Sequence, residues 1–118
     1  MTFHGDYSPE AHSAASDKAR AAAVFADHAE VIVAALPDVP EGHVLIAVVD
    51  ETHEFTGTHH VARDDIAGRV PELEGEAGWA FVVSPGTDAE EIRRRADEMG
   101  TLARRRAEMI TRIRTRRS

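Results

Sequence analysis

The chain has 118 residues, 42% of them hydrophobic and 30% charged, and its formal net charge is −7. At this length a single domain over residues 1–118 is expected, with residues 1–8 and 114–118 frayed. Because the sequence contains no cysteine, disulfide frameworks, thiolate nucleophiles and cysteine-ligated metals are excluded. It also shows no apolar run long enough for a membrane span and no secretory signal pattern, so a cytoplasmic protein is expected.

Charge is distributed unevenly along the chain. Up to Thr87, 4 basic residues against 15 acidic ones give −11, whereas from Asp88 onward 10 arginines against 6 acidic residues give +4. The acidic majority argues against indiscriminate nucleic-acid binding, while the basic end allows an anionic partner or association between opposite ends of two copies. The 13 arginines against 1 lysine, with abundant alanine, indicate GC-rich coding and hence a bacterial or phage origin.

A long N-terminal helix is predicted from Pro9 to Leu36. Ser8 is a suitable N-cap, Pro9 fits the first helical position, and Pro37 stops the helix. One face carries apolar residues at spacings of three and four, namely Ala22, Phe25, Ala29, Ile32 and Leu36.

Three strands are predicted after this helix. The β-branched run His43–Asp50 indicates a central strand covered on both faces, and Glu54–His60 is predicted to return as the second strand of a hairpin. A short helix over 63–70 and an acidic loop over 71–78 precede the third strand, Trp79–Val83.

A long C-terminal helix is predicted to begin with a T-x-x-E capping box formed by Thr87 and Glu90. The predicted fold is therefore α+β or α/β: a two-layer sandwich on a three-stranded mixed sheet, made of a β-hairpin plus one crossover strand parallel to 54–60. The residues expected in the core are Phe25, Ile32, Leu36, Leu45, Val49, Ile66, Trp79, Phe81, Val83, Ile92 and Met99.

The final helix carries a repeat of apolar positions at spacings of three and four, at Ile92, Ala96, Met99, Ala103, Arg106, Ile110 and Ile113, with only Arg106 out of pattern. From Thr87 to Arg116 it would be roughly 45 Å long, whereas a strand of five to seven residues spans about 17 to 24 Å. Its distal half must therefore reach beyond the sheet. That half either contacts another protein or folds back along the first helix of its own chain.

The leading functional hypothesis follows from this distal half. It predicts a small non-catalytic protein-interaction or assembly module that uses the Arg-rich amphipathic helix for oligomerisation or for docking on a larger partner. The expected partner is a second copy of the chain, giving a dimer, or a larger protein assembly. Neither a membrane nor a cofactor is expected. Nucleic acid is the less favoured partner, since no aromatic residue is interspersed among the C-terminal arginines for base stacking. The predicted contact residues are Leu102, Arg105, Met109, Ile110, Arg112, Ile113 and Arg116.

The alternative hypothesis is a metal-dependent or acid–base enzyme built on the histidines around the hairpin. With a two-residue turn, His43 would lie opposite His60, close enough for both to bind one metal ion, and Asp64 could add a carboxylate. For acid–base chemistry, His53 or His59 would act with Asp50, Glu51 or Glu54 as the orienting acid. A change of one residue in the turn would destroy the His43–His60 pairing.

Overall fold

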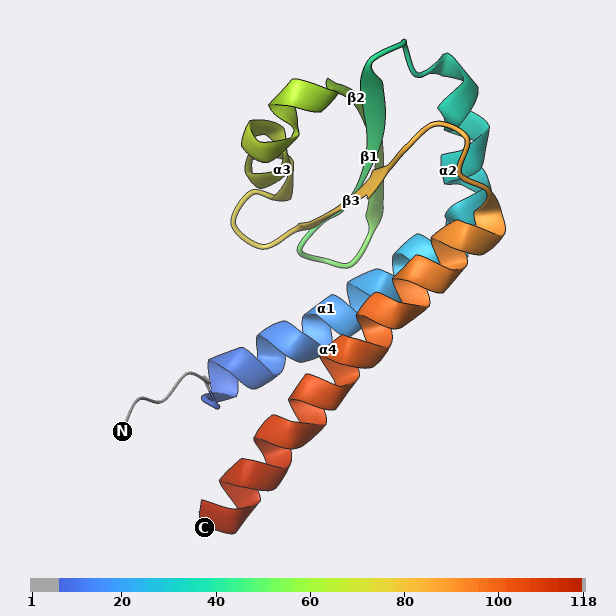
Figure 1. Ribbon diagram of the computed structural model, residues 1–118. Helices are drawn as coiled ribbons and strands as arrows, with labels where there is room; N and C mark the ends of the chain where they lie inside the picture. The colour runs from blue at the N-terminus through green and yellow to red at the C-terminus, as the bar shows by residue number, and fades with distance from the viewer. Residues whose placement is uncertain (1–6, 118) are drawn as a thin grey trace.

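The computed structural model describes residues 7–117, which form a three-stranded sheet with helices against both faces and a projecting pair of long helices (Figure 1). The α+β class is confirmed. Residues 1–6 and 118, part of the predicted frayed ends, lie outside the described residues, but residues 114–117 are helical. The helices are α1 (Pro9–Asp27), α2 (Ala29–Ala35), α3 (Ile66–Glu74) and α4 (Ala89–Arg117); the strands are β1 (His43–Val49), β2 (Phe55–Ala62) and β3 (Trp79–Val83).

The sheet has the order β2-β1-β3, and β1 pairs antiparallel with both neighbours. It is therefore antiparallel throughout rather than mixed. As predicted, β3 runs in the same direction as β2, but it pairs with β1 on the far side instead of with β2. The physical reason is the composition of the strands: residues 44–49 of β1 are all buried, so this strand needs a neighbour at each edge, while the exposed His59 and His60 of β2 suit an edge strand.

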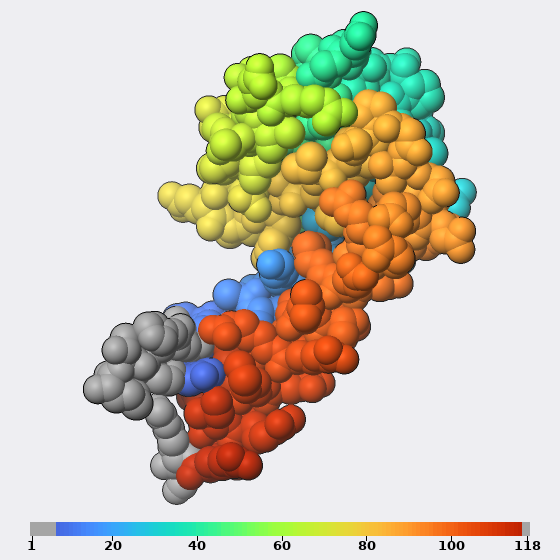
Figure 2. Space-filling view, in the orientation of Figure 1, coloured from blue at the N-terminus to red at the C-terminus, as the bar shows by residue number. Residues whose placement is uncertain are grey.

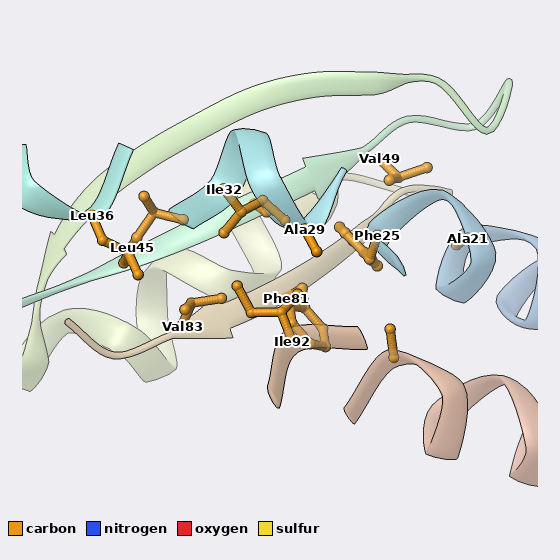
Figure 3. Close-up of a cluster of buried hydrophobic side chains, with 12 residues drawn as sticks. Ala21, Phe25, Ala29, Ile32, Leu36, Leu45, Val49, Phe81, Val83 and Ile92 are labelled. Atoms are coloured by element: carbon orange, nitrogen blue, oxygen red, sulfur yellow. The ribbon is translucent and has the colours of Figure 1, made fainter. Parts of the chain in front are cut away.

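Hydrophobic side chains form two clusters, one on each face of the sheet. The larger lies between the sheet and α1, α2 and α4, and it includes Phe25, Ile32, Leu45, Phe81 and Ile92 (Figure 3). On the other face α3 covers a smaller cluster, so this helix adds a layer to the predicted two-layer sandwich. The predicted core residues are buried, apart from the half-buried Ile66, Trp79 and Met99.

The N-terminal helix was predicted to be continuous, but it breaks at His28. Its backbone has φ −103° and ψ 15°, and its Nδ1 donates to the Val24 carbonyl at 2.8 Å, an acceptor that the His28 backbone N–H also uses. The imidazole stacks on Phe55 of β2, with ring centroids 4.5 Å apart. This break lets α2 follow the sheet while α1 leaves it to lie along α4 (Figure 1).

Two further boundaries differ from the predictions. The middle helix continues through Pro71 to Glu74, where Gly75 ends it at φ 61°, so much of the predicted acidic loop is helical. At the start of α4 the N-cap is Asp88 rather than Thr87: Asp88 Oδ1 accepts from the Glu91 N–H at 2.8 Å, while the Thr87 hydroxyl donates to the Ser84 carbonyl. The capping interaction is therefore displaced by one residue.

Candidate interaction surface on α4

The helix α4 lies antiparallel to α1 along most of the length of α1 (Figure 1). Its buried positions are Ile92, Ala96, Gly100, Ala103, Ala107 and Ile110, and the facing residues of α1 include the buried Ala15, Ala19 and Ala22. Small residues on both helices allow the backbones to approach closely. The distal half of α4 thus folds back along the first helix of its own chain, which was the intrachain alternative.

A second side of α4 faces solvent, and we call it the outer face. It consists of Glu91, Arg94, Glu98, Leu102, Arg105, Met109, Arg112 and Arg116. At 100° per residue these side chains fall on one side of the helix, largely opposite the buried side. Figure 2 shows the solvent-facing side of α4 from its orange N-terminal end to its red C-terminal end.

Leu102 is the most exposed large hydrophobic residue of the described chain. It is 66% exposed, and Met109, seven residues further on, is 38% exposed. Both lie on the outer face, so two large apolar side chains sit one above the other in water. The exposed apolar area of these two side chains is available for burial against another surface.

Ion pairs run along the proximal part of the outer face. The Arg94 guanidinium contacts the Glu91 and Glu98 carboxylates, each at 2.6 Å. The hydrogen bond from Arg94 holds the pKa of Glu91 below its usual range, and the bond to Glu91 raises the pKa of Arg94. Arg94 therefore pairs with both glutamates on the proximal side of Leu102.

A groove beside β3 adjoins Leu102. It is lined by β3, by Ala15 and Lys18 of α1, and by α4 residues that include Met99 and Leu102; Figure 2 shows the hollow between α4 and the sheet. The Arg95 guanidinium donates to the Val82 carbonyl at 2.9 Å and lies 4.6 Å from the centre of the Phe81 ring. Arg95 thus covers part of the open edge of β3.

The predicted contact residues divide between the two sides of α4. Leu102, Arg105, Met109, Arg112 and Arg116 are exposed. Ile110 is fully buried and Ile113 half-buried, so the inclusion of Ile110 was wrong. The error arose because Ile110 continues the buried repeat of α4, whereas Leu102 and Met109 belong to the outer face.

The structure contradicts the predicted histidine pairing. His43 lies opposite Ala62, and His60 lies opposite Leu45. The Asp50 N–H bonds to the Glu54 carbonyl, so the turn is one residue longer than predicted, and a bulge between Val48 and Val49 adds a second residue of shift. Within residues 7–117 no group of three or more histidine, aspartate or glutamate side chains is placed to hold a metal ion.

The predicted acid–base arrangement is also different. Asp50 does not orient His53; its Oδ1 accepts from the Thr52 N–H, the Thr52 hydroxyl and the Glu54 N–H. His53 instead stacks on Trp79, and its Nε2 lies 3.6 Å from an Asp17 carboxylate oxygen of α1. No local sequence signal connects Asp17 with His53, which are brought together only by the packing of α1 under the hairpin.

Comparisons with protein-family models, with curated proteins and with solved structures give no match for this chain. Among the described residues, none of the helices is both long and apolar enough to span a membrane.

Proposed function

We propose that this chain is a small, non-catalytic protein-interaction or assembly module of bacterial or phage origin that acts in the cytoplasm through the outer face of α4. The observation that carries the proposal is the exposure of Leu102 and Met109 on a helix whose other side is already occupied by α1. A helix with one satisfied apolar side and a second, exposed apolar row is typical of an element that packs in two directions.

The residue types of the outer face support this function. Methionine and arginine are enriched at protein–protein interfaces, because both cover large areas and arginine forms directed hydrogen bonds. Leu102 and Met109 are flanked by Arg105 and Arg112, which are exposed. The enzyme hypothesis has lost the His43–His60 pairing on which its metal site depended.

Site-specific photo-crosslinking in the native cells tests the proposal. A photoreactive phenylalanine analogue replaces Leu102 in one variant and, as a matched control, replaces Val31, which is also exposed at 55% but lies on α2. We expect discrete covalent adducts from position 102 and none of comparable yield from position 31. Equal adduct yields, or none from position 102, would contradict an interaction role for the outer face.

A further inference from the structure

The molecule is electrically polarised along its longest dimension. It measures 53 × 27 × 25 Å, with the sheet at one end and the C-terminus at the other (Figure 1). Residues 28–88, which we call the head, carry 2 arginines against 12 acidic residues, or −10, whereas residues 100–117 carry 7 arginines against 1 glutamate, or +6. Two copies placed antiparallel would bring each basic end beside an acidic head.

The same polarity is repeated along the outer face. Glu91, Glu98, Arg105 and Arg112 follow one another at intervals of seven residues, so they form one row along the helix. The two acids precede Leu102 and the two arginines follow it. A half-turn about an axis through Leu102 therefore exchanges acidic positions with basic ones.

An antiparallel pair of α4 helices uses this exchange. With Leu102 opposite its own copy, Glu98 lies four residues before the axis and Arg105 three residues after it, so each Glu98 faces the other copy's Arg105. Glu91 and Arg112, eleven and ten residues from the axis, meet in the same way. A parallel pair would instead place glutamate on glutamate and arginine on arginine.

The side chains needed for this contact are accessible. The Glu98 side chain is 63% exposed and that of Glu91 is 43% exposed, although both already contact Arg94. Exposed ion pairs contribute little stability by themselves, so burial of the apolar side chains of the outer face, Leu102 and Met109, would supply most of the association energy. The charges would determine orientation and exclude the parallel arrangement.

We propose that the occupant of the outer face is a second copy of this chain, docked antiparallel about a two-fold axis that passes near Leu102. This inference rests on the proposed function and specifies its partner. Closed two-fold dimers are the commonest assemblies of identical chains, and the face is complementary to itself in both charge and apolar content.

Complementary charge reversal tests this arrangement. In the Glu98→Arg variant alone, arginine faces arginine at both symmetric contacts, and in the Arg105→Glu variant alone, glutamate faces glutamate. An equimolar mixture of the two variants restores both attractive pairs in a heterodimer. The control is Glu41→Arg, the same charge change at an exposed position of the head away from α4. Circular dichroism melts establish that each variant is folded.

Sedimentation equilibrium gives the outcome. We expect the parent and the Glu41→Arg variant to dimerise, each α4 variant alone to dissociate about tenfold more readily, and the mixture to recover the parental affinity. A parent that stays at 12.9 kDa at all concentrations, or a mixture no tighter than its components, overturns the dimer. Crosslinks from position 102 to a different protein would then leave the proposed function standing, whereas the absence of any crosslink would remove both.

Discussion

Gly100 of α4 lies against Ala22 of α1, and a Cβ built on the glycine would stand 3.3 Å from the Ala22 Cβ. Gly100 is itself buried, at the centre of the row of small residues that joins the two long helices. The close approach of α1 and α4 at this point explains why a glycine stands inside a 29-residue helix, where it costs about 1 kcal/mol relative to alanine.

Enlarging Gly100 should separate the helices. Gly100→Leu is expected to lower the free energy of unfolding by about 1–3 kcal/mol, because the new side chain has no space against α1. Gly100→Ala is expected to be nearly neutral, since the gain in helix propensity is offset by crowding at Ala22. Urea unfolding measures both, and a Gly100→Leu variant as stable as the parent would show that the two helices do not pack in this way.

Leu45 and Leu102 provide a matched test of the buried and exposed surfaces. Leu45 is fully buried in the centre of β1, so Leu45→Ala should cost about 2–5 kcal/mol of stability. Leu102→Ala, measured at concentrations low enough to keep the chain monomeric, should change stability by no more than about 0.5 kcal/mol. Thermal or urea unfolding measures the stability of both variants. Equal losses of unfolding free energy in the two variants would contradict the fold.

Gly78 and Gly68 form a second matched pair. A Cβ on Gly78 would lie 2.6 Å from the Glu74 carbonyl oxygen and 2.9 Å from that of Val49, whereas one on Gly68 has open space. Gly78→Ala should therefore destabilise the entry to β3 by about 1–3 kcal/mol. Gly68→Ala, inside α3, should stabilise the protein by about 0.4–1 kcal/mol, and the opposite order of melting temperatures would refute this account of the connection.

Asp50 should contribute to loss of stability in acid. Hydrogen bonds from the Thr52 hydroxyl and the Glu54 N–H hold its pKa below the usual 3.8. Because the folded pKa is depressed, this stabilisation is fully present above the unfolded value of 3.8 and is lost as the pH falls through the lower folded value. Asp50→Asn keeps an acceptor oxygen but removes the titration. We expect its free energy of unfolding to fall less steeply than that of the parent below pH 3.8; parallel curves would contradict this.

The elements set by local pattern could be predicted from the sequence. The near-continuous β-branched run of β1 indicated a strand covered on both faces, and Ser8 indeed caps α1 by accepting from the Ala11 N–H. Trp79–Val83 is a strand with the predicted bounds. In each case the element can be predicted from interactions between residues close in the chain or from the period of the hydrophobic residues.

The errors come from interactions that local pattern does not encode. His28, where the helix breaks, stacks on Phe55, which lies on a different element. The hairpin register depends on one extra turn residue and a bulge, so the predicted His43–His60 pair was lost. On α4, the spacing of apolar residues located the helix but did not show which of them are buried. Ile110 lies on the buried side, whereas Leu102 lies on the outer face.

Disulfide trapping of single-cysteine variants decides whether the outer face joins two copies about Leu102. The chain has no cysteine of its own, so Leu102→Cys introduces one thiol near the proposed axis, and Arg112→Cys introduces one on the same face but far from it. In an antiparallel pair the two copies of position 112 lie twenty residues apart along the helices, roughly 30 Å, whereas a disulfide needs Cα atoms within about 7 Å.

Under mild oxidation we expect the Leu102→Cys variant to form a covalent dimer many times faster than the Arg112→Cys variant, and the difference to vanish in urea, where both thiols are free to collide. Equal rates for the two variants in the folded protein would contradict the antiparallel interface.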